Sequence, residues 1–449
     1  MHILWPTNRR PEPDSSEKEG IMCFRFNLVA AFVFATLVSL AGVQSISFAG
    51  AASHGATLQG HVRSFGHHHP LIKQPNPLKQ SIPTVNVMDF GAKGDGVTDD
   101  TGAIQNAIAF AQGSGKGVLF PAGTYLHTSI IYDNGVSLIG VGGASVLLAN
   151  NPNATAIFLT GVSPSIQNMV INSSPASTGV ADPVPTHTTL LVQAAQNFVV
   201  QGITIVQGTG REGVLVQQSA VGNVSGVTIN GTGSNQDVGI IMDGCSNVAV
   251  VGNLVLNEID AIVVGTAGLF PFVNSSIALI GNSISTGLVN ANGIATSNVE
   301  TMDLSQNQIQ FSANSGNFAL QINGGDNNSI TQNVTSGGVI GIFLSSSGVS
   351  NVVSQNIIRD CRSEGAIIQT SAGSGNVAFL SNQLGECGTV NATPVVQLAP
   401  GLGPNDITVI NNIYTGHANA LTFFLRSTAH LNFVSGNTQT QTALANSIP

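Results

Sequence analysis

Two acidic residues in the C-terminal half occupy matching positions relative to two asparagines. Asp360 is four residues after Asn356, and Glu386 is four residues after Asn382. If those asparagines mark equivalent points of a repeating fold, the two carboxyl groups lie side by side. Paired carboxylates act as acid and base in glycoside hydrolysis, and they also bind Ca²⁺. We therefore take Asp360 and Glu386 as candidate catalytic residues and Ca²⁺ as a candidate cofactor. The alternative is a solvated row of charges at a turn.

Charged residues close to this pair in the sequence are candidates for substrate binding. Arg359, Arg362 and Glu364 surround Asp360, and an arginine can pair with a carboxylate of a substrate. His417 lies five residues after the next asparagine of the same series. We expect these four residues to bind substrate, while the identity of any metal stays open.

A second row of polar residues comes directly before short apolar runs that begin with Gly or Ala. Its members are Glu212, Asp260, Asn292 and Glu364. Glu258 and Asp260 are two apart on an extended run, so they face the same side. We add Asp260 and Glu258 to the catalytic candidates, and Glu212 to the substrate-binding ones, on the floor of a groove. The alternative is that short acids favour turns for backbone reasons.

The part of the chain that carries these groups has a sequence repeat, and an asparagine marks each repeat. The asparagine returns about once every 25 residues, each time before a short apolar run, and a period of this size indicates stacked units. The series is Asn253, Asn282, Asn307, Asn333, Asn356, Asn382, Asn412 and Asn437.

Each period contains about three short β-rich runs separated by Gly, Ser and Asn turns, with no amphipathic helix between them. This pattern predicts an all-β fold, a right-handed parallel β-helix with three-strand coils of about 25 residues. We expect the repeated asparagine to sit at a turn, to adopt a left-handed backbone, and to form a side-chain ladder along the axis. The alternative fold is a β-sandwich, which needs no residue recurring in register.

Two cysteines also share one offset from the repeated asparagine. Cys361 and Cys387 should lie on adjacent coils, at a separation that a disulfide accepts. We predict a Cys361–Cys387 disulfide, and the alternative is a pair of inward-facing thiols. Cys245 is expected to be a lone core residue.

Composition limits the ligands this chain can bind. Only 8% of the 449 residues are charged, the net charge is −9, and no lysine follows Lys116. A phosphate backbone would find few cations here, so a nucleic-acid partner is not expected. Few aromatic residues remain for stacking on sugars, and the absence of lysine from the coils removes one type of lyase base. Both features weigh against catalysis.

The N-terminus is typical of a secreted protein. We interpret residues 1–49 as a signal peptide in which residues 1–21 are an atypical leader and Met22 is the true start. The alternative is an uncleaved anchor helix. Cleavage leaves no membrane span in the mature chain, which we expect to be extracellular or periplasmic. Residues 50–83 lack periodicity and are interpreted as a flexible linker, and residues 84–449 as one β-helix domain.

The domain is expected to open with a cap and first coils in residues 84–145. Thr98 is a candidate N-cap, with Asp99 and Asp100 in the first turn of a short helix, where acids suit the helix dipole. This helix can cover the open end of the coil stack. Its buried face is predicted to consist of Ile104, Ala107, Ile108 and Ala111.

The same segment resembles the opening of the pectate lyase-like superfamily, which includes rhamnogalacturonase- and epimerase-like proteins and phage tailspikes. Residues 89–100 read Asp-Phe-Gly-Ala-Lys-Gly-Asp-Gly-Val-Thr-Asp-Asp, and residues 120–125 read Phe-Pro-Ala-Gly-Thr-Tyr. The resemblance implies the parallel β-helix and an extracellular polysaccharide ligand. The Asp-Pro-His phrase of the mannuronan epimerases is absent, as are the Gly-His-Gly and Arg-Ile-Lys phrases of the polygalacturonases, so the reaction does not transfer.

Two functional hypotheses follow. The first is an enzyme of lyase, glycoside hydrolase or epimerase type that acts on an acidic polysaccharide. The second is a non-catalytic polysaccharide-binding or adhesin-like β-helix protein. The sequence leaves the oligomeric state open.

Overall fold

A computed structural model of the chain describes residues 82–152, 154–176, 187–265, 273–312, 316–346, 348–370, 376–388, 395–399, 407–416, 423–425 and 431–439. The expected signal peptide lies outside these ranges, as do His417 and all but the last two residues of the expected linker. Among the described residues, no helix is long and apolar enough to cross a membrane.

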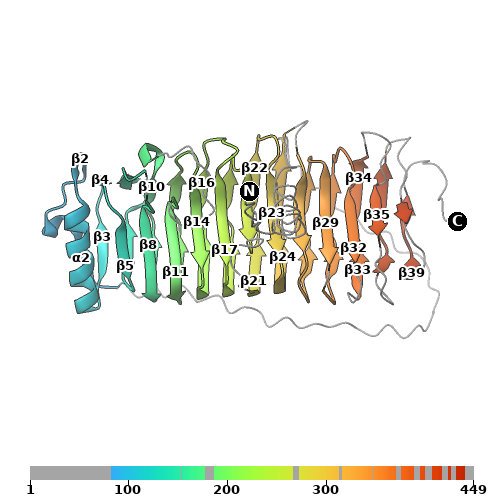
Figure 1. Cartoon of the computed structure of the whole chain (residues 1–449), viewed down its shortest axis with the longest axis horizontal. Helices are drawn as coiled ribbons and strands as arrows, with labels where there is room; N and C mark the ends of the chain where they lie inside the picture. Colours follow the sequence, from blue (N-terminus) through green and yellow to red (C-terminus); the bar gives the residue numbers. More distant parts are fainter. Residues whose placement is uncertain are drawn as a thin grey trace, which may run out of the picture.

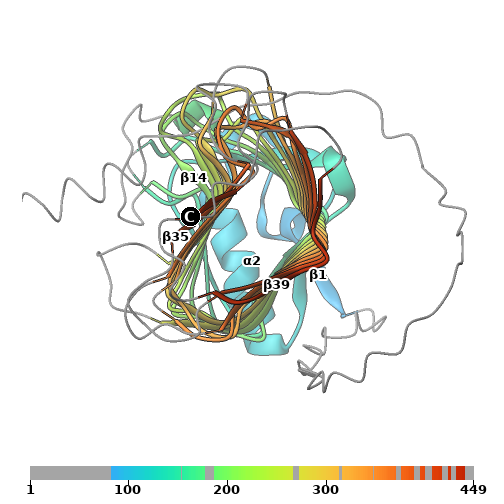
Figure 2. The ribbon, with the colours of Figure 1, turned by 90° about the vertical axis from the view of Figure 1, so that its right-hand side faces the viewer.

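The chain forms an all-β parallel β-helix, as predicted, whose coils stack side by side along one axis (Figure 1). Each coil, here called a rung, contributes one strand to each of three faces. Viewed along the axis, the strands of successive rungs superimpose (Figure 2).

Face A is a 14-stranded sheet. Its strands are β2 (Asp95–Asp99), β4 (Gly123–His127), β7 (Ser145–Ala149), β10 (Val170–Asn172), β13 (Thr204–Val206), β16 (Thr228–Asn230), β19 (Leu254–Leu256), β22 (Ser283–Thr286), β25 (Gln308–Phe311), β28 (Val334–Ser336), β31 (Ile357–Arg359), β34 (Gln383–Cys387), β37 (Ile413–Gly416) and β40 (Thr438–Gln439).

Faces B and C are joined in one 26-stranded sheet. Face B contains β5 (Ile131–Asn134), β8 (Ile157–Val162), β11 (Leu190–Gln196), β14 (Glu212–Gln217), β17 (Val238–Asp243), β20 (Asp260–Val264), β23 (Asn292–Ser297), β26 (Phe318–Asn323), β29 (Ile340–Ser346), β32 (Ala366–Thr370), β35 (Val396–Ala399) and β38 (Phe423–Leu425). Face C contains β1 (Thr84–Asn86), β3 (Gly117–Phe120), β6 (Ser137–Gly140), β9 (Ser165–Gln167), β12 (Val199–Gln201), β15 (Ala220–Ser225), β18 (Ser246–Val251), β21 (Asn274–Ile280), β24 (Val299–Ser305), β27 (Ser329–Thr331), β30 (Val352–Ser354), β33 (Val377–Leu380), β36 (Ile407–Ile410) and β39 (Leu431–Ser435).

The interior is a set of aliphatic stacks. In one of them Val214, Ile240, Ile262 and Ile294 are register partners on successive strands of face B, and all four are fully buried. Because side chains alternate across a strand, the neighbouring positions of these strands point outward.

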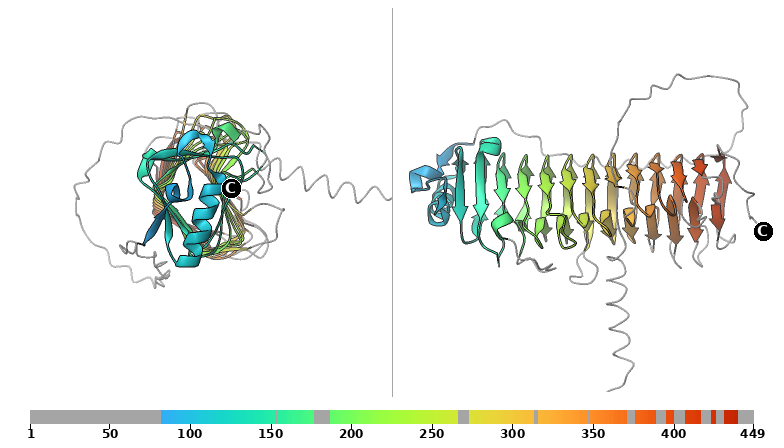
Figure 3. Two further views of the ribbon diagram at one scale, coloured as in Figure 1. Left: turned by 90° about the vertical axis from the view of Figure 1, so that its left-hand side faces the viewer. Right: turned by 90° about the horizontal axis from the view of Figure 1, so that it is seen from above.

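One α-helix, α2 (Thr101–Ser114), lies across the N-terminal end of the stack (Figure 3), and η1 (Val87–Phe90), η2 (Gly142–Ala144) and η3 (Ser174–Ala176) are short 3₁₀ turns. The predicted face is confirmed, since Ile104, Ala107, Ile108 and Ala111 are buried.

The predicted start of this helix is wrong by two residues. Thr98 belongs to β2, and Asp100 occupies the N-cap position without a side-chain cap bond. The carboxylate of Asp100 instead accepts bonds from the backbone N–H groups of Lys93 and Gly94, at 2.7 and 3.0 Å. Asp99 performs the capping role, accepting the backbone N–H of Thr101 at 3.0 Å.

The predicted asparagine ladder is confirmed. Asn333 is typical: its Oδ1 accepts the backbone N–H and the Nδ2 of Asn307, at 3.0 and 2.9 Å, and its own Nδ2 donates to Asn356 Oδ1 and Leu304 O, at 3.0 and 2.8 Å. The same pattern runs from Asn253 to Asn437. These buried amides therefore have all their hydrogen bonds satisfied.

The predicted left-handed backbone belongs to the residue before each asparagine. The expectation that the asparagine itself adopts it is wrong, because its side chain must point inward to reach the next rung. The positive-φ positions are Gly252, Gly281, Gln306, Gln332, Gln355, Ser381, Asn411 and Gly436. A shorter ladder that the sequence did not reveal links Met302, Asn328 and Asn351 through backbone N–H bonds to the asparagine Oδ1 atoms.

We predict that Asn333→Ala destabilises the β-helix strongly. The substitution removes the acceptor of the buried backbone N–H and Nδ2 of Asn307, and the side-chain donor to Leu304 O, which should lower the free energy of unfolding by about 3 kcal/mol. Denaturant unfolding measures the change. Gln308→Ala, on the exposed side of β25, is the control and should change stability little. Equal destabilisation by both substitutions would contradict a stabilising ladder.

Candidate ligand-binding face

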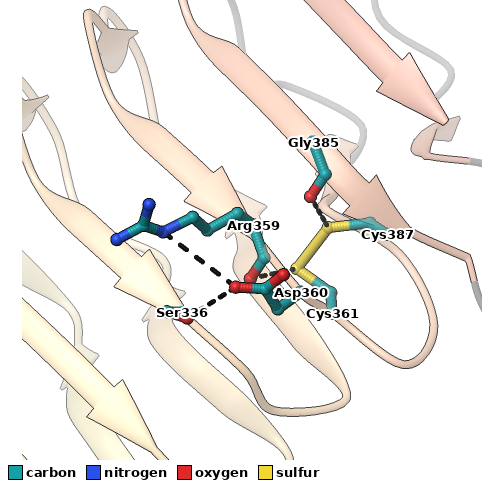
Figure 4. A network of polar contacts seen from close by, with 6 residues as sticks. All are labelled: Ser336, Arg359, Asp360, Cys361, Gly385 and Cys387. Carbon is teal, nitrogen blue, oxygen red and sulfur yellow. Dashed lines mark hydrogen bonds and ion pairs between the residues drawn. A yellow bond between two sulfur atoms is a disulfide. The ribbon is translucent and has the colours of Figure 1, made fainter. Parts of the chain in front are cut away.

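The structure places Asp360 and Glu386 at equivalent positions on adjacent rungs, as the asparagine offset predicted. The backbone N–H of Asp360 donates to Gly385 O at 3.0 Å, and both acidic residues have a left-handed backbone, with φ of 60° and 56°. The predicted disulfide joins the next residues, Cys361 and Cys387, whose Cα atoms are 4.3 Å apart (Figure 4).

Asp360 is a solvated carboxylate at the end of face A. Ser336 Oγ donates to its Oδ2 at 2.8 Å, and Arg359 Nε lies 4.0 Å from the same oxygen, with both side chains more than half exposed (Figure 4). An ion pair this exposed contributes little to stability. Glu386 is also exposed. Both carboxyl groups are thus accessible from solvent, and their catalytic role stays a prediction.

Two of the predicted substrate-binding residues, Arg362 and Glu364, lie in the turn before β32 and form hydrogen bonds there. Arg362 is partly buried, and its Nη2 donates to Gly316 O at 3.0 Å. Glu364 is buried and accepts a bond from the hydroxyl of Ser363. The Glu364 bond lies within the turn, and the Arg362 bond joins the turn to the segment that precedes β26.

Glu258 and Asp260 lie inside the protein. Glu258 is 0% exposed, and burial, followed by the nearby charges of Asp237 and Asp260, raises its pKa well above the usual value. Burial raises the pKa of Asp260 to about 6, against a bond from Asn292 Nδ2 at 2.7 Å that lowers it. These two carboxyl groups form an interior pair and do not meet Asp360 or Glu386.

The surroundings of Glu258 favour its protonated form. Gln207 lies beside it, and Gln207 Nε2 donates to Arg211 O and Val238 O. Neither oxygen of Glu258 has a donor of good hydrogen-bond geometry among the described residues. An ionised Glu258 would therefore be poorly compensated in the interior, and protonation removes that charge.

The polar residues predicted to form a row before the apolar runs are register partners on neighbouring strands. Their side chains are buried. Glu212, Val238, Asp260 and Asn292 are successive register partners, and the three polar members are at most 6% exposed. Glu212 accepts a bond from Thr188 Oγ1 at 3.0 Å, toward the preceding rung. Asp260 bonds toward the following rung, so the two carboxyl groups point apart. Within the described residues, no three His, Cys, Asp or Glu side chains gather to hold a metal ion.

Sequence reasoning missed two rows on the outer surface of face B, whose strands β14 and β35 lie on one side of the coil (Figure 2). The apolar row occupies the middle of each strand, and its larger members lie outside the interior core cluster. Register partners along it are Tyr132, Phe158, Leu191, Leu215, Ile241, Val263, Ala295, Gln321, Phe343 and Ile367. Tyr132, Phe158, Ile241, Ala295 and Phe343 are exposed or partly exposed, whereas Leu191, Leu215, Val263, Gln321 and Ile367 are at most 8% exposed. Phe318 packs on Phe343 with ring centroids 5.0 Å apart.

The polar row lies two residues further along the same strands. Its members are Gln193, Gln217 and Asp243 on β11, β14 and β17, and Ser297, Asn323, Ser345 and Gln369 on β23, β26, β29 and β32. Gln193 donates to Gln217 Oε1 at 2.5 Å. An apolar strip beside amides and hydroxyls is a surface that can bind a ligand with both apolar and hydroxyl groups. In the sequence, these polar residues follow the outward-facing apolar residue by two positions on the strands of face B.

We predict that Glu258→Gln stabilises the protein at high pH. The folded protein keeps protons on Glu258 and Asp260 that the unfolded chain releases above its ordinary glutamate pKa of 4.5, so the free energy of unfolding falls as pH rises from there toward the raised pKa values. Glutamine removes the ionisation. The melting temperature of the variant should exceed that of the unsubstituted protein by several degrees at pH 8, and match it near pH 4.5.

Asp360→Asn is the matched control for this experiment, because Asp360 is exposed. It should change the melting temperature little at either pH. A Glu258→Gln effect of equal size at both pH values would show that Glu258 does not titrate in the folded protein as its burial implies.

Known proteins share both the fold and short stretches of sequence with this chain. The chain is 28% identical over 166 residues, 34% of its length, to the glucan 1,3-beta-glucosidase of Cochliobolus carbonum, and the match spans only 20% of that relative. The fold resembles the Streptococcus pneumoniae surface protein and adhesin PfbA, with a TM-score of 0.54 and 15% identity, over 80% of this chain and 100% of that chain. It also resembles the A-module of the Azotobacter vinelandii mannuronan C-5 epimerase AlgE6, with a TM-score of 0.51 and 16% identity, over 80% and 99% of the two chains.

Family membership rests on a longer match. The family model described as rhamnogalacturonase A/epimerase, pectate lyase-like, matches residues 84–391, well over half of the chain. This confirms the resemblance drawn from residues 89–100 and 120–125. The chain belongs to the rhamnogalacturonase A/epimerase, pectate lyase-like family.

Proposed function

We propose that this protein is an extracellular polysaccharide-binding β-helix, and that the polysaccharide lies along the outer surface of face B. The observation that carries the proposal is the pair of rows there, one apolar and one of amides and hydroxyls, whose partly exposed members include Ile241, Phe343, Ser297, Asn323 and Ser345. Sugar rings have apolar C–H surfaces and hydroxyl edges, and the two rows offer a partner to each.

The period of the fold suits a polymer. Adjacent rungs lie about 4.8 Å apart, so each step of the apolar row repeats nearly the same surface. From Gln193 on β11 to Gln369 on β32, both partly exposed, the polar row beside it spans eight strands, a length of about 34 Å. A row this long can contact several sugar rings at once, and each contact can be weak while the whole chain binds well.

The positions of the carboxyl groups favour binding over cleavage. Glu258 and Asp260 are sealed inside the fold, and Glu212 and Asp260 point apart. A glycosidase needs two carboxyl groups that reach the same glycosidic bond from either side. The buried acids of face B therefore serve its structure, and the polysaccharide meets side chains that bind without reacting.

Secretion belongs to the same proposal. The Cys361–Cys387 disulfide is the kind of bond that persists outside the cytosol, and residues 1–49 have the composition of a signal peptide. The glucosidase and the adhesin named above are similar proteins whose names indicate a glucan and a cell surface, which supports an extracellular setting.

We predict that the double substitution Ile241→Ala and Phe343→Ala weakens polysaccharide binding at least tenfold. Both side chains are partly exposed members of the apolar row, and their removal deletes apolar contact worth more than 1.4 kcal/mol. Affinity electrophoresis against a panel of soluble plant, fungal and bacterial polysaccharides measures the loss. Leu254→Ala, an exposed apolar residue on face A, is the control and should bind as the unsubstituted protein does. Binding that survives the double substitution would place the ligand elsewhere.

Catalysis by Asp360 and Glu386 is the second candidate function, favoured by their adjacent, solvent-accessible positions beside the turn that enters face B. If the pair is catalytic, Asp360→Asn and Glu386→Gln should each lower turnover at least a hundredfold. Product formation is followed as reducing ends and as absorbance of unsaturated uronates, with and without Ca²⁺. Full activity in both variants would exclude this pair, and no turnover by the unsubstituted protein would leave binding as its function.

A further inference from the structure

We infer that the polysaccharide bound along face B is uncharged, an inference that rests on the proposed function and names its ligand class. It differs from the acidic ligand expected from the sequence.

The described part of the coil stack has three arginines after Lys116, and none belongs to the apolar or the polar row. Arg211 is 1% exposed, and its guanidinium donates to Ala154 O and Thr188 O at 2.9 and 3.0 Å. The guanidinium group of Arg211 therefore lies in the interior. A ligand on the outer surface does not reach it.

The other two arginines lie together near one turn. Arg362 Nη2 donates to Gly316 O, and Arg359 sits beside Asp360 at the end of face A. Two cations at one turn can meet one or two sugar units. They cannot compensate a carboxylate on every sugar of a chain that spans about seven rung spacings, or about 34 Å.

Among the described residues, neither row presents an exposed charged side chain. Asp243 belongs to the polar row by register but is 1% exposed, and Glu212 and Asp260 are buried on the same strands. A polyuronate laid along this face would place its carboxylates against apolar groups, amides and hydroxyls, with no cation from either row. That arrangement desolvates charges without compensation. Hydroxyl groups meet no such penalty, because amides and serines both donate and accept hydrogen bonds.

The inference is tested on the full chain lacking residues 1–49. Its binding to a neutral β-glucan and to an alginate of similar length is measured by isothermal titration calorimetry at low and high NaCl. We expect the glucan to bind at least tenfold more tightly than alginate at low salt, with an affinity that changes less than twofold as salt rises, since no ion pairs are screened. Longer glucan oligosaccharides should bind more tightly than shorter ones.

A charge-gain variant tests the same point without depending on which glucan is chosen. Ser297→Lys with Ser345→Lys adds two cations to the polar row, on strands β23 and β29. It should gain alginate binding at least tenfold at low salt and lose that gain at high salt. Ser285→Lys, on the outer side of β22 in face A, is the matched control and should gain nothing.

The possible results distinguish a failure of this inference from a failure of the proposed function. Preferential, salt-sensitive binding of alginate by the unsubstituted protein would overturn the inference and leave the proposed function standing. No binding of either polysaccharide by the unsubstituted protein, and none of alginate by the double-lysine variant, would overturn both. Equal alginate binding by the double-lysine variant and the Ser285→Lys control would show that the ligand does not follow the polar row.

Discussion

The structure depends on the hydrogen bonds that each repeated asparagine makes to the rungs on either side. A single Oδ1 accepts both the backbone N–H and the side-chain amide of the previous asparagine, so each turn is locked to the next. The turn geometry, with a left-handed residue before each asparagine, follows from this, and so does the register of the three faces. Because the register is fixed, side chains far apart in sequence form straight rows. The disulfide, the interior stacks and both outer rows of face B are consequences of that alignment.

This constraint explains how much of the molecule the sequence could predict. The asparagine period predicted the parallel β-helix, the ladder, and the adjacency of Cys361 with Cys387 and of Asp360 with Glu386, because offsets from a fixed point translate directly into rung neighbours. A period says which residues are rung neighbours and does not say which side of the coil a side chain faces. The burial of Glu258 and Asp260 and the outward rows of face B therefore needed the structure. The helix start was misplaced because Asp99, Asp100 and Thr98 are all plausible caps, and tertiary bonds to Lys93 and Gly94 decide among them.

The buried acids and the outer rows of face B have different roles: the acids stabilise the fold, and the rows form the proposed binding surface. Asp237 and Asp260 join neighbouring turns from inside: Asp237 accepts the backbone N–H groups of Gly210 and Thr232 at 2.9 and 2.8 Å, and Asp260 accepts a bond from Asn292. The partly exposed members of the outer rows carry no charge, because Asp243 is buried, and they present apolar, amide and hydroxyl groups. A surface with this repeat recognises the general form of a polymer and does not single out one bond in it. This arrangement differs from an active site, where a few groups converge on one point.

The Cys361–Cys387 disulfide has a mechanical consequence. In a one-dimensional stack each rung is held only by its neighbours, so a pulling force can peel coils away one at a time from an end. The disulfide joins the rung of β31 to the rung of β34 by a covalent bond beside the ladder. Force applied to the C-terminal coils would pass through this bond from Cys387 to Cys361, so the residues between the two cysteines would not be extended by the load.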